Sequence, residues 1–421
     1  MQFTGHENVA LLLSIGAILI LSRLASEFGK QLALPLVAGE LLLGILAGPT
    51  VFGYFYPRQF DSLFPIEGAG KPIMQGITQL SVIMLLFVAG LEVQLRVLIK
   101  ERRAAMLISV MSIILPLVCG FLVVWYQPQI FAIRRGEILA YALFFGIAMS
   151  VSAIPVIARI LMDLKLYKTE LGMIIMAAAT LSDMAGWVIF SLILGLIGNQ
   201  VEMKDIAKQA GLIVTFFILV LLLGRRVIST SLAWANTKLS WPGGVLSICI
   251  GSALIAAAFT ESIGLHANLG AFIMGIAIGN SENLAPKARE IMYEFVMNIL
   301  APLFFVSIGL QLNFVHCFNP RLVIMVFSLA VVLKMASVML GARMVGLNMR
   351  ECLVVAFGLN VRGVMEIILG RLAFDAGLID GEMFVALVVM ALLTSIISAP
   401  LLKKVASTSV GHSYQDYWLR A

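Results

Sequence analysis

Long, uninterrupted apolar segments separated by short charged or turn-rich breaks dominate the pattern of this chain. Most segments have about the 20 residues that an α-helix needs to cross a bilayer, and the second and the ninth are shorter. None shows the alternating pattern of a membrane β-strand. The pattern therefore predicts an all-α polytopic membrane protein. The expected spans, about thirteen in number, are 8–28, 34–49, 73–95, 105–125, 138–160, 171–197, 206–223, 241–260, 267–280, 292–310, 320–342, 352–374 and 382–402.

Two stretches of the chain repeat each other. Residues 39–48 and 270–279 both carry glycines spaced five and then four apart, and the motif at 87–91 is echoed at 305–310. The matching spans are the second and the ninth, and an odd offset requires two units of opposite topology. Inverted repeats are typical of secondary transporters, although glycine-rich membrane helices that pack closely also produce such spacings.

The repeat predicts how the membrane domain is organised. We expect a first six-helix repeat, one linker helix, a second six-helix repeat and then a short cytoplasmic tail. The expected boundaries are 1–402 for the membrane domain, about 8–197, 206–223 and 241–402 for its three parts, and 403–421 for the tail.

Two corresponding spans carry interruptions. Pro155 follows a serine-rich stretch in the fifth span, and Asn360 and Arg362 lie between two glycines in the twelfth. Proline disrupts a helix by removing a backbone donor, and paired breaks in corresponding helices point to the binding site of a transporter. We therefore expect crossed discontinuous helices, supported by Pro155, Asn360, Arg362 and Glu366.

Composition agrees with this class. Hydrophobic residues make up 61% of the chain, charged residues 12%, and the mean hydropathy is +1.02. Soluble domains have far more charge. The net charge of +6 is spread over the loops, so it indicates membrane orientation rather than a nucleic-acid surface. The four cysteines lack metal-ligand spacing.

Lysine and arginine fall mainly on one predicted side of the membrane. That side should be cytoplasmic, which places the N-terminus outside and the C-terminus inside. Three basic residues lie inside spans and away from the span ends: Arg23, Lys334 and Arg362.

Asp183 is the only ionisable residue of the sixth span. A carboxylate at mid-bilayer depth usually marks an ion or proton pathway; a neutral Asp bonded to a neighbouring helix is the structural alternative. Carboxylate and hydroxyl oxygens suit Na⁺, K⁺ or Li⁺. We therefore predict a monovalent-cation site at Asp183, with the hydroxyls of Thr180, Ser182, Ser150 and Ser152 as further ligands.

Lys334 lies too deep in the eleventh span to reach either membrane surface. We expect it to pair with Asp183 when no cation is bound, and to act with it in transport. Arg362 and Glu366 are four residues apart, so they are expected to pair with each other and hold the broken helix together. The sequence does not assign a role to Glu40.

Four motifs together resemble the monovalent cation:proton antiporter-2 family. They lie at 149–159, 179–187, 264–272 and 360–366, and the resemblance extends over nearly the whole chain. It implies a dimeric sodium/proton antiporter-like fold of thirteen helices, with crossed broken helices and elevator-type alternating access. It also implies that Asp183 is the ion-binding aspartate and Lys334 its charged partner.

The chain departs from the family pattern at Ser182. Electrogenic members resemble an Asp-Asp pair and Kef-type members a Gln-Asp pair, whereas a serine precedes Asp183 here. Kef-type proteins also carry a nucleotide-binding domain, and residues 403–421 lack a glycine-rich phosphate loop. We therefore expect no nucleotide-binding domain, no cofactor and no nucleic-acid partner.

The sequence thus predicts an antiporter of the cell inner (plasma) membrane that exchanges Na⁺ or K⁺ for protons, one for one and without net charge. A passive cation channel and an organic-anion symporter with the same inverted repeat remain alternatives, because broken helices serve both. An enzyme is not expected: an intramembrane aspartyl protease needs a second mid-span carboxylate as acid or base, and the spans hold no second Asp.

Overall fold

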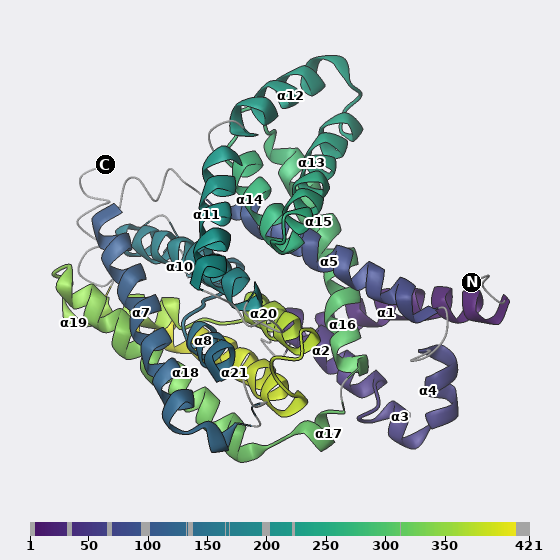
Figure 1. Cartoon of the computed structure of the whole chain (residues 1–421), viewed down its shortest axis with the longest axis horizontal. Coiled ribbons are helices and arrows are strands. Elements are labelled where there is room, and N and C mark those ends of the chain that lie inside the picture. The colour runs from purple at the N-terminus through teal and green to yellow at the C-terminus, as the bar shows by residue number, and fades with distance from the viewer. Residues whose placement is uncertain are drawn as a thin grey trace. The chain divides into compact units, whose positions relative to one another are not determined.

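The structure is a computed structural model. It describes residues 5–31, 36–64, 70–93, 102–131, 133, 138–164, 166–167, 169–195, 203–220, 224–311 and 313–409. The described residues are helical or in turns (Figure 1). The predicted all-α class is therefore confirmed. Most of the predicted tail, residues 410–421, lies outside the described part, and the last helix continues to Ser409.

Eight helical segments are long and apolar enough to cross a membrane, and a ninth span is a bent pair of helices, within the part of the chain that the structure describes. The other predicted spans correspond to helices that are shorter: α2 (Leu36–Ala47), α8 (Ile138–Ala148), α11 (Met203–Leu219) and α14 (Ala267–Gly279). The protein is multi-pass, and the number thirteen stays a prediction.

The chain forms two compact units, each built from two separate stretches. The first unit is Met1–Val93 with Ala207–Phe318, and the second is Gln94–Ile206 with Asn319–Ala421. Each unit thus draws on both halves of the chain, which is a different division from the sequence repeat. The repeat boundaries stay a prediction.

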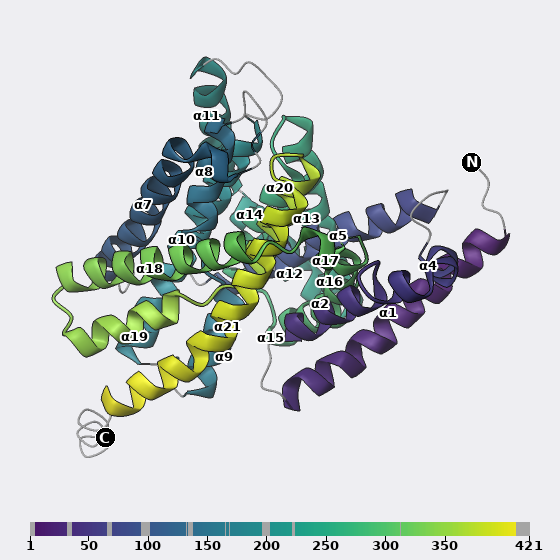
Figure 2. The ribbon, with the colours of Figure 1, turned by 90° about the horizontal axis from the view of Figure 1, so that it is seen from below.

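The first unit contains α1, α2, α5 and the helices of the middle of the chain, and α1 and α2 run side by side (Figure 2). Besides α2, α14 and most of α11, its helical elements are α1 (Gly5–Gln31), α3 (Phe52–Phe55), α4 (Pro57–Leu63), α5 (Gly70–Glu92), α12 (Arg225–Lys238), α13 (Gly243–Ser262), α15 (Pro286–Phe295), the π-helical turn Val296–Leu300, α16 (Ala301–Gln311) and α17 (Phe314–Cys317).

The second unit holds every residue predicted for the site. It is formed by α7 (Arg102–Tyr126), the 3₁₀ turn Pro128–Ile130, α8, α9 (Ile154–Asp163), α10 (Glu170–Gly195), α18 (Pro320–Met344), α19 (Met349–Leu359), α20 (Val364–Asp375) and α21 (Gly381–Ser409). Helix α7 packs against α8, α10 and α18, and α19 packs against α10, α18 and α21.

Glycines allow two close helix crossings in the first unit. A Cβ on Gly275 of α14 would lie 2.2 Å from the carbonyl oxygen of Phe87 of α5, and one on Gly44 of α2 would lie 2.4 Å from that of Val306 of α16. Each is the middle glycine of its repeated triplet. The middle and last glycines of each triplet therefore pack on a helix from the other half of the chain, at a distance that only glycine permits. The first glycine of each triplet packs on a helix of its own half, α1 or α13.

We predict that Gly275→Ala destabilises the protein by roughly 1–3 kcal/mol, because the new methyl group meets a backbone oxygen that cannot rotate away. Thermal unfolding of the detergent-solubilised protein measures the effect. Gly251→Ala in α13 is the matched control, since a Cβ there meets nothing within 4 Å and alanine favours a helix. Equal midpoints for the two variants would contradict the close crossing.

Candidate ion-binding site

The fifth predicted span is broken into two half-helices. Helix α8 ends at Ala148 and α9 begins at Ile154, and the residues between them are not helical. Pro155 lies in the first turn of α9. Proline is favoured there because its missing N–H has no intrahelical partner in any case. Pro155 therefore starts the second half-helix instead of kinking a continuous one.

The twelfth predicted span is broken as well. Helix α19 ends at Leu359, α20 begins at Val364, and the two axes are bent by 47°. Asn360 is the C-terminal cap of α19, and its backbone N–H donates to the carbonyl of Ala356. Both helix breaks that the sequence predicts are present.

The two breaks are hydrogen-bonded to each other. The backbone N–H of Ala153 donates to the carbonyl of Val361 at 3.0 Å. The hydroxyl of Ser152 donates to the carbonyl of Leu359 at 2.7 Å. Backbone groups freed by one break are thus satisfied at the other, which allows irregular backbone to lie at membrane depth.

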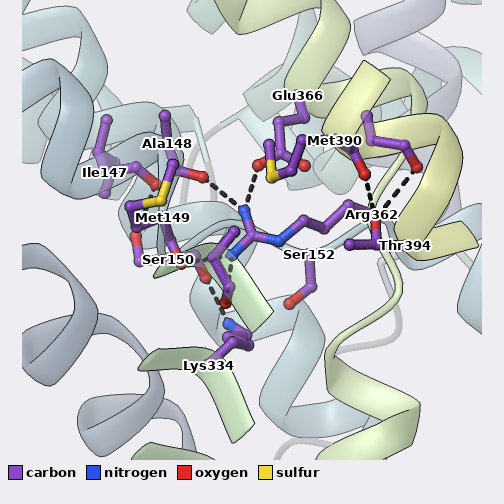
Figure 3. Close-up of polar contacts among 12 residues, drawn as sticks. Ile147, Ala148, Met149, Ser150, Ser152, Lys334, Arg362, Glu366, Met390 and Thr394 are labelled. Atoms are coloured by element: carbon purple, nitrogen blue, oxygen red, sulfur yellow. Dashed lines mark hydrogen bonds and ion pairs between the residues drawn. The ribbon is translucent and has the colours of Figure 1, made fainter. Parts of the chain in front are cut away.

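Arg362 occupies the junction between the breaks (Figure 3). Its side chain is fully buried, and its guanidinium donates to the carbonyls of Ala148 and Met149, each at 2.5 Å. These carbonyls end α8, where backbone acceptors lack helical partners and the helix dipole is negative. A permanent cation therefore caps this half-helix.

Glu366 pairs with Arg362, as their spacing predicts, and lies in the first turn of α20. A carboxylate is stabilised there by the positive end of the helix dipole. The ion pair spans the N-terminal end of α20 and the C-terminal end of α8. It holds opposite ends of two half-helices together.

Lys334 is fully buried on α18, and its ammonium donates to the carbonyl of Ser150 in the first break and to that of Ser112 on α7, the latter at 3.4 Å. No ion pair joins it to Asp183. The direct pair expected from the sequence is therefore wrong for this structure. The break exposes the carbonyl of Ser150 near the ammonium, and this acceptor takes the place of the carboxylate.

Asp183 lies on α10 with 1% of its surface exposed. Neither carboxylate oxygen has a hydrogen-bond partner among the described residues. Lys334 and Glu366 both act on it electrostatically. A buried carboxylate without partners is costly when ionised, so it either takes up a proton or binds a cation.

The predicted hydroxyl ligands are all buried, and their protons are engaged elsewhere. Thr180 donates to Met176, and Ser150 donates to Ile147, each at 2.8 Å. A donating hydroxyl keeps oxygen lone pairs for a cation. Ser182 instead contacts Ser109 and Ser112 of α7.

Sequence reasoning missed three residues near this site. Ser109 and Ser112 contact Ser182, and Ser395 of α21 donates to the carbonyl of Arg362. The signal was present for the first two, because two hydroxyls three apart lie on one face of an otherwise apolar helix. Ser395 had no such signal.

The fold and this site define a membrane transporter of the cation/proton antiporter class. Two broken helices meet at a site that holds the buried carboxylate of Asp183 and the buried cationic side chains of Lys334 and Arg362. The family model of the transmembrane sodium/hydrogen exchanger matches residues 11–405. The chain belongs to that family, and the resemblance stated from the four motifs is confirmed.

The chain is similar to several antiporters over most of its length. The chain is 28% identical to the Na(+)/H(+) antiporter NhaS4 of Synechocystis sp., covering 94% of this chain and 98% of that protein. It is 27% identical to the Na(+)/H(+)-K(+) antiporter GerN of Bacillus cereus, covering 92% and 94%. Cation/H(+) antiporter 20 of Arabidopsis thaliana is 29% identical over 93% of this chain, which spans only 48% of that protein.

The sodium proton antiporter MjNhaP1 from Methanocaldococcus jannaschii has a similar fold. Its TM-score is 0.68 at 17% identity, with 96% of this chain and 98% of that chain covered. At this identity the likeness establishes the fold alone.

Proposed function

We propose that this protein exchanges a monovalent cation, Na⁺ or K⁺, for protons, and that Asp183 carries both in turn. The observation that carries the proposal is the buried carboxylate whose two oxygens lack partners. Such a group is stable only when a proton or a cation neutralises it. Both ligands need the same oxygens, so binding of one excludes the other.

Lys334 and Arg362 set the electrostatic balance of the site. Arg362 is already matched by Glu366, whereas Lys334 is bound only by neutral carbonyls. Among the described residues, the hydrogen-bond acceptors of Lys334 are thus uncharged, and its positive charge lowers the cost of ionising Asp183 and repels a cation that arrives there. We propose that Lys334 keeps cation binding weak enough for release on the far side of the membrane.

Alternating access completes the cycle. We propose that the two compact units are the bodies that move, and that the second unit carries Asp183 with its ligand. We also propose a homodimer in the cell inner (plasma) membrane, with the N-terminus outside and the C-terminus in the cytoplasm. The basic residues of the loops support this orientation.

One titratable carboxylate supports a one-for-one exchange. Asp183 holds one proton or balances one monovalent cation, so a complete cycle moves no net charge. We expect exchange in vesicles to be independent of membrane potential, and the apparent cation affinity to fall as the pH falls, because protons compete for Asp183.

Exchange measured with Na⁺, K⁺ and Li⁺ in turn identifies the cation. A second series at several potassium–valinomycin potentials then tests charge movement, provided that K⁺ is not a substrate. A rate that follows the potential would contradict one-for-one exchange and assign a second proton to Lys334. Flux that ignores the proton gradient would favour a passive channel instead.

A further inference from the structure

Three buried serine hydroxyls meet between α7 and α10. The hydroxyl oxygen of Ser182 lies 3.2 Å from that of Ser109 and 3.0 Å from that of Ser112. All three side chains are at most 3% exposed. This cluster joins the helix of Asp183 to α7, through side chains of α7 to which the exchange mechanism has assigned no role.

The hydroxyl protons can be assigned by counting. Ser112 donates to the carbonyl of Ser109 at 3.0 Å, so its single proton is used. Ser182 must then donate to Ser112, and Ser109 to Ser182. The result is a directed chain from Ser109 through Ser182 to Ser112, in which every proton is engaged.

The serine cluster is linked to both Asp183 and Lys334. Ser182 precedes Asp183 on α10, and the main-chain carbonyl of Ser112 accepts a hydrogen bond from Lys334. The cluster is therefore a short polar connection between the helix of the carboxylate and a residue that holds the ammonium. The charged groups that act on Lys334 are Arg362, Glu366 and Asp183.

We infer that Ser109, Ser112 and Ser182 are positioning residues: their hydroxyl chain fastens α10 to α7 and fixes the separation of Asp183 from Lys334. The inference rests on the proposed exchange at Asp183 and assigns Ser182 a role other than cation ligand. Separation matters because the attraction between unit charges varies inversely with distance. Widening it from about 6 to about 8 Å, at an effective dielectric near 20, changes the proton affinity of Asp183 about threefold, which is about half a pH unit.

The sign of the effect follows from this geometry. Removing one hydroxyl from the hydrogen-bonded series of Ser109, Ser182 and Ser112 lets α10 move away from α7. The ammonium of Lys334 then has a weaker influence on Asp183. Asp183 then holds its proton more tightly, and exchange begins at higher pH. Cation binding to the ionised carboxylate becomes somewhat stronger, because no ligand is lost and the ammonium repels the cation less.

The experiment measures exchange in vesicles against pH and against cation concentration. Ser109→Ala and Ser182→Ala should each shift the pH of half-maximal exchange upward by about half a unit. The double variant should shift it no further, because either change cuts the same chain. Ser182→Thr, which keeps the hydroxyl, should restore the wild-type profile. The KM for the cation, measured well above the pH midpoint, should stay the same or fall, by at most about threefold.

Two results would overturn the inference. A rise of about tenfold in KM for Ser182→Ala, with Ser109→Ala unaffected, would make Ser182 a cation ligand. An unchanged pH profile in every variant would reduce the cluster to packing. If Ser182→Ala does not fold, Ser109→Ala carries the test from the other end of the chain.

Ser191→Ala is the matched control, because Ser191 is a buried serine on the same helix and its hydroxyl has no hydrogen-bond partner among the described residues. It should leave the pH profile unchanged. Asp183→Asn in the same vesicles separates the two hypotheses. Exchange that survives Asp183→Asn refutes the proposed function, whereas its loss beside unaltered serine variants refutes only the positioning role.

Discussion

Asp183→Asn is expected to abolish coupled exchange in reconstituted vesicles, down to the level of vesicles without protein. Asparagine has the same shape but can neither release a proton nor balance a cation. The protein itself should remain folded and become more stable, because a buried carboxylate without partners is replaced by a neutral amide. Cation-driven proton movement and thermal unfolding, measured on the same preparation, check both parts.

Asp375→Asn provides the matched control for this variant. Asp375 lies at the end of α20 in the same unit, half-exposed and paired with Arg371 four residues before it. Arg371 is buried, but asparagine still offers it an oxygen acceptor and the pair is not part of the candidate site, so exchange should persist. Exchange by Asp183→Asn at the wild-type rate would refute the assignment of the carrier.

Arg362→Met is expected to lower the stability by roughly 3–5 kcal/mol, because it leaves the buried carboxylate of Glu366 without its partner. It also removes the donor from the carbonyls of Ala148 and Met149. Thermal unfolding measures the loss. The double variant Arg362→Met with Glu366→Gln should recover part of it, since the stranded charge is gone.

Lys287→Gln is the control for Arg362→Met. Lys287 pairs with Glu290 on the surface of the first unit, where both side chains are exposed. Its loss should cost at most about 1 kcal/mol. Additive effects of the Arg362 and Glu366 changes would argue against a coupled pair.

The sequence alone was sufficient for the class and for the helix breaks. A mean hydropathy of +1.02 leaves few alternatives to membrane helices. The breaks were predictable from paired interruptions in corresponding spans and not from proline alone, because Pro116 and Pro400 lie inside the continuous helices α7 and α21. The pairing of Arg362 with Glu366 was predictable for a similar reason, because residues four apart in a helical segment share a face.

The partner of Lys334 was not predictable in the same way. From sequence alone, a buried cationic side chain is expected to pair with a buried anionic one, and Asp183 was the candidate on that basis. The structure offers Lys334 the carbonyl of Ser150 instead, an acceptor that every residue has and that only the break makes available. The serines of α7 were missed because hydroxyls in apolar helices usually bond to their own backbone, and only the packing of α7 on α10 brings them to Ser182.

The division of each unit between distant stretches has a consequence for biosynthesis. Ala148 precedes Arg362 by 214 residues, and ribosomes add about 5–20 residues per second. The carbonyls at the end of α8 therefore lack their Arg362 donor for roughly 10–40 s, until Arg362 has been synthesised. During that interval the nascent second unit has an exposed polar surface, and its survival depends on transient partners such as water, lipid headgroups or the insertion machinery.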